Sequence, residues 1–299
     1  DITDNKLLYE LKPNEQRSIA SLTKIVTTIT ALESIEDLQN EVTITNSMLS
    51  KVRWDASIAG LKAGETYTYE DLLYASILPS GADATISLAI STSGSIENFV
   101  NKMNDLTDRI GMTNSNFVNV HGLDEKGHYS TAEDIHKLLI YCLKNPKFKE
   151  IYTTKEYKLS TGKIVKSTVK TAGTRIGKDT SRILGSKTGF TLGAGLCMSA
   201  IINSDNHEIL IITLGATPNT GNTFHTTDNL LNVFSSSVTA ITGHPGPIPA
   251  NFLAEFPVCV YVTIAFASMC SAIAHVVYAI FFSISSKVGC QGWMRRLHR

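Results

Sequence analysis

Ser21 and Lys24 stand three positions apart in "ASLTKIVTTITALE" (residues 20–33), an apolar segment with helical spacing. A serine hydroxyl becomes a good nucleophile when a neighbouring base takes its proton, and residues i and i+3 share one face of a helix. Apolar surroundings favour the neutral amine that a base requires, and the N–H groups at a helix N-terminus favour developing negative charge. The pair therefore predicts nucleophilic catalysis by Ser21 with Lys24 as its base. A lysine whose stem lies along an ordinary amphipathic helix fits the same spacing.

Spacing alone does not identify the pair, because the pattern Ser-x-x-Lys occurs twice more. Ser160 with Lys163 and Ser167 with Lys170 repeat it in a polar stretch of the chain. Solvated side chains are the expected interpretation for both. The choice of Ser21 therefore depends on its position at the start of an apolar helix and on residues elsewhere in the chain.

Two further segments carry residues of a suitable type. "LPSGAD" (residues 78–83) places Ser80 on a Pro/Gly loop, where a side chain is held by the scaffold yet accessible. "SKTGF" (residues 186–190) places Lys187, Thr188 and Gly189 on an expected strand. A lysine supplies positive charge, a threonine supplies a hydroxyl that can bind a carboxylate, and a glycine lets a ligand approach the strand closely. These residues predict a subsite for an anionic group.

The elements that position these residues follow from hydrophobic periodicity and capping signals. Thr68 with Asp71, and Ser130 with Glu133, form expected capping boxes. The periodicity predicts strands at residues 6–11, 185–191, 194–202 and 208–216, the last two as a hairpin, and helices at 18–33, 84–90, 96–110, 132–143 and 227–238. This order predicts an α+β fold, with an antiparallel sheet flanked by helices and a helical subdomain inserted between its first and later strands. We expect the site at the seam between sheet and helical subdomain.

Composition narrows the possible partners. The 299 residues include 27 basic and 27 acidic side chains, with no basic stripe, so nucleic acid is not an expected partner. The five cysteines are scattered without the paired spacing of a metal site, and neither a metal nor a cofactor is expected.

The C-terminal part has a different character. Residues 256–286 contain no Asp, Glu, Lys or Arg, and this run is longer than the ~20 residues that cross a bilayer. We predict a catalytic domain at 1–241, a proline-containing linker at 242–255, a transmembrane anchor at 256–286 and a short basic tail at 287–299. Because the tail is basic, it is expected in the cytoplasm, with the catalytic domain outside. A buried core helix is the alternative interpretation of the apolar run.

The three segments together resemble a known family. The combination of Ser-x-x-Lys, a Ser-x-Asn-type motif and Lys-Thr-Gly occurs in class A β-lactamases and penicillin-binding proteins. "ASLTKIVT", "LKAGETYTYEDLLYASILPSGADA", "HGLDEKGHYSTAEDI" and "LGSKTGFTLGAG" are similar, in this order, to blocks of the D-alanyl-D-alanine carboxypeptidases, which are low-mass penicillin-binding proteins. The resemblance covers about residues 6–234 and is specific because four separated blocks agree.

The resemblance implies a serine D,D-carboxypeptidase of the cell envelope that trims peptidoglycan, and the apolar run at 256–286 adds a membrane anchor to this expectation. Ser21 would attack the carbonyl between the two terminal D-alanines of a stem peptide, with Lys24 as base and Ser80 as proton relay to the departing amine. Lys187 and Thr188 would hold the terminal carboxylate. β-Lactams would acylate Ser21 because they mimic the D-Ala-D-Ala end.

The resemblance also implies an oxyanion hole made by the backbone N–H groups of Ser21 and Phe190. The chain departs from the family pattern at Ala82, where an asparagine is usual, and at His225, where many relatives have an arginine. Asp83 is expected to be a helix-start carboxylate rather than a replacement for that asparagine. His121 and His128 are expected to serve the structure of their loop, because a lysine already supplies the base.

Two alternatives stay open from the sequence. A β-lactamase would need a deacylating carboxylate near an asparagine, and no Glu-x-x-Leu-Asn pattern lies between Ser80 and Lys187. A penicillin-sequestering or wall-binding module that turns over slowly fits the absent asparagine at Ala82.

Overall fold

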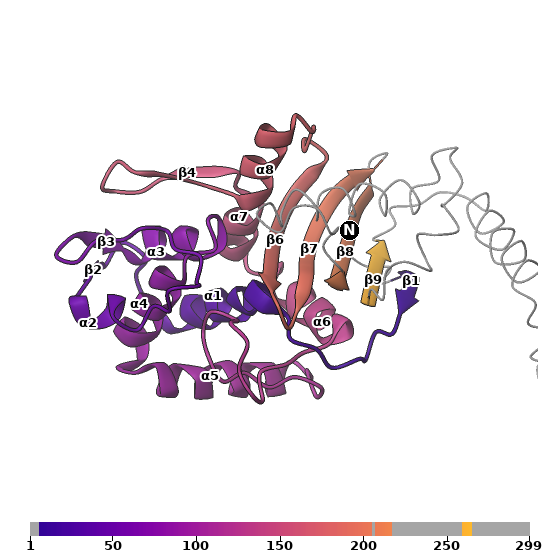
Figure 1. The fold of residues 1–299 in the computed structure, drawn as a ribbon, viewed down its shortest axis with the longest axis horizontal. Coiled ribbons are helices and arrows are strands. Elements are labelled where there is room, and N and C mark those ends of the chain that lie inside the picture. Colours follow the sequence, from indigo (N-terminus) through magenta and orange to yellow (C-terminus); the bar gives the residue numbers. More distant parts are fainter. Residues whose placement is uncertain (1–5, 205–206, 217–258, 265–299) are drawn as a thin grey trace, which may run out of the picture.

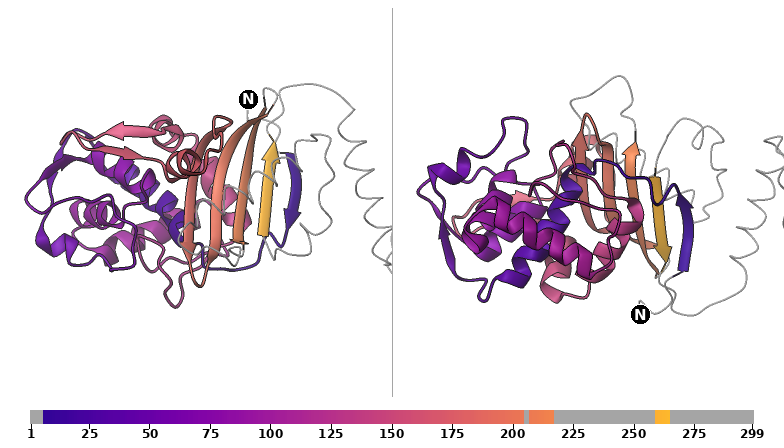
Figure 2. Two further views of the ribbon diagram at one scale, coloured as in Figure 1. Left: turned by 45° about the horizontal axis from the view of Figure 1, so that its top comes forward. Right: turned by 90° about the horizontal axis from the view of Figure 1, so that it is seen from below.

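The computed structural model describes residues 6–204, 207–216 and 259–264, which include a five-stranded antiparallel sheet. Five strands are hydrogen-bonded in the order β1-β9-β8-β7-β6, so β1 and β6 form the two edges (Figures 1 and 2). The strands are β1 (Lys6–Leu11), β6 (Ile183–Thr191), β7 (Gly195–Ser204), β8 (His207–Ala216) and β9 (Cys259–Ile264). This arrangement confirms the predicted antiparallel sheet and the predicted hairpin, which β7 and β8 form.

A block of helices lies beside the sheet and faces the β6 edge (Figure 1). The helical elements are the 3₁₀ turn η1 (Ala20–Leu22), α1 (Thr23–Ser34), α2 (Asn46–Leu49), α3 (Tyr69–Ile77), α4 (Ala82–Ser93), α5 (Ile96–Arg109), α6 (Ala132–Cys142), α7 (Pro146–Thr153) and α8 (Thr168–Ile176). Two small two-stranded antiparallel sheets complete the block, β2 (Glu41–Thr43) with β3 (Thr66–Thr68), and β4 (Glu156–Lys158) with β5 (Ile164–Lys166). The α+β arrangement with a helical subdomain is therefore confirmed.

Helix α1 lies at the centre of the molecule. Its residues from Thr23 to Ala31 are all buried, so water is excluded around the whole helix rather than along one stripe. Thr27 and Thr28, which lie among its apolar residues, find partners inside the protein, whereas the buried Thr30 hydroxyl has no hydrogen-bond partner among the described residues. Thr28 Oγ1 lies 2.8 Å from Ser76 Oγ of α3, and Thr27 Oγ1 donates to the Val120 carbonyl at 2.9 Å. A lysine on this helix loses its hydration unless it reaches a surface, which sets the conditions for Lys24.

Local signals fix the element boundaries, with two differences from the sequence prediction. The predicted capping box of Thr68 and Asp71 opens α3. Helix α6, however, is capped by Thr131, whose hydroxyl accepts from the Asp134 N–H, while Ser130 instead pairs with the backbone of Arg17. The predicted helix at 18–33 begins only at Thr23. Its first part is a 3₁₀ turn because Ala20 has a left-handed backbone with a φ of 48°.

The prediction of a transmembrane helix from residue 256 is wrong for residues 259–264. These residues form β9, which pairs with β1 on one side and β8 on the other. The segment "CVYVTI" is rich in β-branched residues, which favour strands, and the gap between β1 and β8 offers backbone partners on both sides. The length of the uncharged run hid this local preference.

No helix in the described residues is both long and apolar enough to cross a membrane. The predicted helix at 227–238, the linker at 242–255, the tail at 287–299 and the remaining part of the predicted span lie outside the described residues. The domain boundary predicted at residue 241 lies outside them as well.

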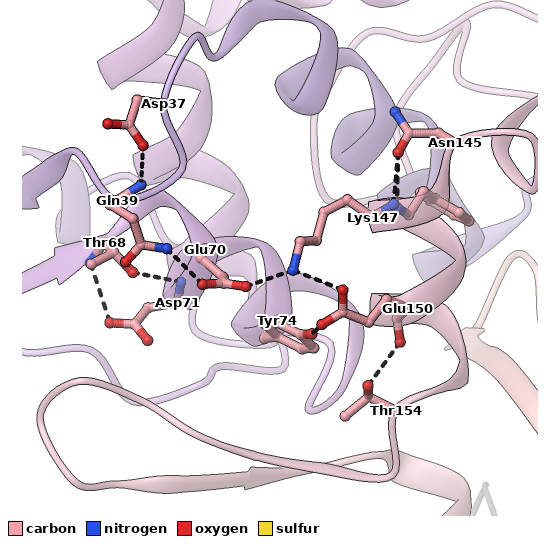
Figure 3. Close-up of polar contacts among 11 residues, drawn as sticks. Asp37, Gln39, Thr68, Glu70, Asp71, Tyr74, Asn145, Lys147, Glu150 and Thr154 are labelled. Atoms are coloured by element: carbon pink, nitrogen blue, oxygen red, sulfur yellow. Dashed lines mark hydrogen bonds and ion pairs between the residues drawn. The ribbon is translucent and has the colours of Figure 1, made fainter.

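Helix α7 joins the helical block to the sheet. On one side it packs against β6, where a side chain at Gly185 would stand 2.7 Å from the Tyr152 ring. On the other side, Lys147 Nζ donates to Glu70 of α3 at 2.7 Å and to Glu150 at 2.8 Å (Figure 3). Tyr74 of α3 donates to the same Glu150 carboxylate at 2.6 Å. We call Glu70, Tyr74, Lys147 and Glu150 the α3–α7 clamp.

Candidate active site

Ser21 lies in η1, on a turn with an unusual backbone. The preceding residue, Ala20, has positive φ, which costs a non-glycine residue energy and persists only where neighbours hold it. Thr23 Oγ1 donates to the Ala20 carbonyl at 2.9 Å. Gly122 lies against the same carbonyl, so closely that a side chain there would stand 1.9 Å from its oxygen. The turn is therefore held from two sides.

Lys24 lies one helical turn after Ser21, and its Nζ is 2.8 Å from Ser21 Oγ. The same Nζ donates to the His121 carbonyl at 2.8 Å. Only 2% of Lys24 is exposed, and burial lowers the pKa of the amine to about 7, although the charge of Asp83 opposes this shift. A substantial fraction of the amine is then neutral near neutral pH. Such an amine can accept the proton of the serine hydroxyl.

A second serine–lysine pair faces the first. Ser80 lies in the loop between α3 and α4 with a φ of 64°, and Lys187 Nζ of β6 donates to its Oγ at 2.9 Å. Lys187 also donates to the Thr188 carbonyl at 2.6 Å. Burial holds the pKa of Lys187 well below its usual range, and the charge of Lys24 lowers it further. The sequence suggested a fixed positive charge here, whereas the burial of Lys187 favours the neutral amine when no anion is bound.

Strand β6 brings the Lys-Thr-Gly segment against the Ser21 turn. A side chain at Gly189 would stand 2.7 Å from the Ser21 nitrogen and 2.9 Å from Ala20 Cβ. The glycine therefore lets the Ser21 turn approach the strand closely. The sequence analysis instead explains this glycine by the close approach of a ligand. Phe190 follows Gly189 along β6 and is half-buried. Thr188 is buried, and its hydroxyl lies 2.7 Å from that of Thr168 at the start of α8.

The structure thus brings the predicted side chains to one place. Ser21 with Lys24 and Ser80 with Lys187 form two hydrogen-bonded pairs, close enough for the charge of one lysine to act on the other. The pairs meet at the predicted seam between the helical block and β6, an edge strand of the sheet. A nucleophile, a base and a second hydroxyl beside an amine are the groups that acyl transfer requires.

The two other Ser-x-x-Lys pairs are not brought together in this way. The Ser160 hydroxyl and backbone N–H both donate to Asp71, while Lys163 Nζ donates to the Gly60 carbonyl. Ser167 caps α8, and Lys170 pairs with Glu156 at 2.6 Å. Both pairs serve the local structure.

The position of the usual asparagine is occupied by the buried Ala82, and within the part of the chain that the structure describes no amide side chain bonds to Lys24 Nζ. The main-chain carbonyl of His121 supplies the second acceptor for Lys24 instead. Sequence reasoning missed this contact because a carbonyl group leaves no signature in residue types. Asp83 accepts from the N–H groups of residues 59–61 and of Ala84, which agrees with its expected structural role.

His121 and His128 are not placed as bases. Burial lowers the pKa of His121 to about 3, with a further contribution from the charge of Lys24, and burial lowers the pKa of His128 to about 4. His121 Nδ1 accepts from the Leu123 N–H within its own loop, at 3.2 Å. His128 Nε2 lies 2.8 Å from Thr23 Oγ1, a contact that the sequence did not indicate.

The fold and the two serine–lysine pairs are those of a serine enzyme of the transpeptidase-like class. Within this class, the chain belongs to the D-alanyl-D-alanine carboxypeptidase family, peptidase family S11, whose sequence model matches residues 1–218.

Relatives and solved structures agree with this assignment. The chain is 32% identical over 218 residues to D-alanyl-D-alanine carboxypeptidase DacF of Bacillus subtilis, covering 71% of this chain and 54% of that one. It is 30% identical over 228 residues to DacC of Escherichia coli, covering 72% and 55%. A point mutant of the Streptomyces K15 DD-transpeptidase superposes with a TM-score of 0.60 at 28% identity, covering 69% and 83%. The chain spans about half the length of the curated relatives it matches.

Proposed function

We propose that this protein is a serine D,D-carboxypeptidase that removes the terminal D-alanine from peptidoglycan stem pentapeptides. The observation that carries the proposal is the buried Lys24 amine, 2.8 Å from Ser21 Oγ and with its pKa lowered to about 7. An ordinary exposed lysine has a pKa near 10.4 and is a poor base at neutral pH. The relatives named above carry this activity in their names.

Acylation begins with the neutral Lys24 amine, which takes the proton of Ser21 as Oγ attacks the carbonyl carbon between the two D-alanines. The oxyanion that forms is held by the N–H groups of Ser21 and Phe190, and loss of one such donor typically costs about 3 kcal/mol of transition-state stabilisation. The C–N bond then breaks. Ser80 gives its proton to the departing amine, and Lys187, which donates to Ser80 Oγ, replaces it.

Before deacylation, Lys24, whose pKa is about 7, releases to solvent the proton that it took from Ser21, and Lys187 regains a proton from solvent. A water molecule then gives a proton to the neutral Lys24 amine and attacks the acyl carbonyl. The bond to Ser21 Oγ breaks, and Lys24 returns the proton to form the hydroxyl again. Because D-alanine has left and a water oxygen has entered, the products are free D-alanine and the shortened peptide acid.

The anionic end of the substrate binds beside Lys187 and Thr188. An arriving carboxylate favours the charged form of Lys187, so substrate binding would raise the pKa that burial holds low. The ion pair then forms only when a free carboxylate is present. This dependence supports an enzyme that acts at the C-terminal end of a peptide.

The test is labelling by fluorescent penicillin together with release of D-alanine from a pentapeptide ending in D-Ala-D-Ala. We expect both in the wild-type protein and neither in Ser21→Ala. Ser160→Ala and Ser167→Ala are the matched controls because they repeat the motif spacing, and both should label normally. Labelling that survives Ser21→Ala contradicts the proposal.

A second candidate is a penicillin-binding module that turns over slowly, and the absence of an amide side chain at Ala82 favours it. In that case penicillin labels Ser21 but D-alanine release is not detected. A β-lactamase would instead consume penicillin in many turnovers, with a label that decays. The same two assays therefore separate the three functions.

The proposed substrate implies an extracytoplasmic catalytic domain, because peptidoglycan lies outside the cytoplasm. We further propose that residues 265–286, which contain no Asp, Glu, Lys or Arg, associate with the membrane. Fractionation of cells that express the full chain, compared with a chain that ends at residue 264, tests this. Equal release of both into the soluble fraction contradicts it.

A further inference from the structure

His128 is buried beneath the turn that carries Ser21, and the proposed mechanism leaves it without a role. Only 3% of its surface is exposed. The Val118 N–H donates to Nδ1 at 3.2 Å, so a neutral ring carries its hydrogen on Nε2. Nε2 lies 2.8 Å from Thr23 Oγ1 and therefore donates to it. The low pKa, about 4, keeps the ring in this neutral form at pH 7.

The Thr23 hydroxyl connects His128 to the Ser21 turn through a second hydrogen bond. Its hydroxyl accepts from His128 and donates to the Ala20 carbonyl at 2.9 Å. The Ala20 carbonyl and the Ser21 N–H belong to one planar peptide group and point in opposite directions. Whatever fixes the carbonyl therefore also fixes the direction of the Ser21 N–H. Hydrogen bonds in such a chain also polarise one another, which makes the N–H a stronger donor.

The Ala20 turn needs this support because of its strained backbone. Ala20 has a φ of 48°, and Gly122 packs against its carbonyl oxygen. A left-handed non-glycine residue relaxes when its contacts are removed. Relaxation of Ala20 would rotate the peptide group and turn the Ser21 N–H away from its present direction.

We propose that His128 is a positioning residue, which acts through Thr23 to hold the Ala20–Ser21 peptide so that the Ser21 N–H faces the developing oxyanion. The inference rests on the proposed function, because the oxyanion arises only when Ser21 is acylated. His128 does not touch the substrate. Its contribution lies in the transition state rather than in binding.

The test compares variants that break the chain at either link. His128→Phe keeps an aromatic ring beside Phe117 but loses both nitrogens, and Thr23→Val keeps the side-chain shape but loses the hydroxyl. Each should lower the acylation rate at saturating fluorescent penicillin by about tenfold, less than the loss of the donor itself. The penicillin concentration at half-maximal rate should change by less than about twofold. Thr23→Ser retains the hydroxyl and should restore the rate.

Thr28→Val is the matched control. Thr28 is buried on the same helix, and its hydroxyl lies 2.8 Å from Ser76 Oγ of α3, which is not part of the Ser21 turn. We expect this variant to lose thermal stability but keep the wild-type acylation rate. The double variant His128→Phe/Thr23→Val should be no slower than the slower single variant, because one broken link already disconnects the chain.

Three results would overturn the inference alone: wild-type rates in both single variants, rate losses that multiply in the double variant, or an equal loss in Thr28→Val. If His128→Phe does not fold, the comparison of Thr23→Val with Thr23→Ser decides. Absence of labelling in the wild-type protein contradicts the proposed function, and this inference with it.

Discussion

Lys24 is the residue whose environment matters most, because helix α1 removes it from water on all sides. A buried amine is less stable as an ammonium ion, which is the physical origin of its low pKa. The hydrogen bonds to Ser21 Oγ and to the His121 carbonyl satisfy the neutral amine but replace only part of the lost hydration. The residue is therefore expected to lower the stability of the fold while it makes the chemistry possible.

Lys24→Met tests this cost. The folded-state pKa, about 7, lies below the unfolded value, 10.5, so the wild-type protein gains stability as pH rises from 7 to 10.5. The methionine variant lacks this term. At pH 6 its free energy of unfolding should exceed that of the wild type by about 4 kcal/mol, and the difference should shrink toward pH 10 as the wild type gains stability. Urea unfolding at the two pH values measures it. A wild-type protein that is more stable at pH 6 than the variant would contradict the account.

Residue types indicated most of the residues of the site, but they did not indicate the pKa values of its lysines. Ser21, Lys24, Ser80 and Lys187 are recognisable because each belongs to a short motif. The low pKa of Lys187 depends on its burial and on Lys24, which is distant in the chain. Contacts of this kind arise only from the tertiary structure.

At the scale of elements, the two halves of the site come from different parts of the fold. Ser21 and Lys24 belong to η1 and α1, Ser80 follows α3, and Lys187 lies on the edge strand β6. The α3–α7 clamp connects the last two, because it joins α3 to α7 (Figure 3) and α7 packs against β6 at Gly185. The clamp is therefore expected to hold the spacing between Ser80 and Lys187.

Lys147→Met tests the clamp. Lys147 bridges two carboxylates, and burial would lower its pKa, but the hydrogen bonds to Glu150 and Glu70 outweigh burial and raise it. Its loss should reduce the free energy of unfolding by about 1 kcal/mol and slow penicillin labelling, since a network contributes more than one exposed pair. Lys170→Met, which removes the exposed pair with Glu156, should cost less than about 0.5 kcal/mol and leave labelling unchanged. Equal effects of the two variants would contradict the role of the clamp.

Element boundaries show where local signals suffice. Thr68 and Asp71 form the predicted capping box because both partners are close in sequence. The start of α1 was predicted too early, because Ala20 takes its left-handed backbone beside Gly122, which is about one hundred residues away. A backbone conformation that depends on a distant loop cannot be predicted from a short window of the sequence.

At the scale of the whole molecule, the sheet is completed by a strand that the sequence analysis assigned to a membrane helix. Strand β9 separates β1 from β8 and supplies hydrogen bonds to both. Hydrophobicity predicts an apolar environment for this segment, but it does not distinguish a strand of the sheet from a helix in the lipid. The pairing partners of β9 lie far away in the chain, so its register could not be predicted.

Val262→Pro tests this strand. Val262 pairs with Tyr9 of β1 and Ile211 of β8, and proline removes a backbone N–H from a central position. We expect the free energy of unfolding to fall by about 3 kcal/mol, a loss that a proline in the interior of a regular element typically causes. Thermal unfolding measures it. An unchanged melting temperature would show that β9 does not stabilise the domain.

The central claim, that a neutral Lys24 amine activates Ser21, is tested most directly by the pH dependence of acylation. The rate at which one penicillin adds to the peptide that contains Ser21, followed by mass spectrometry, should rise with pH through an inflection near pH 7, because the amine must lose its proton first. An inflection near pH 10, or an adduct on a different serine, would contradict the account.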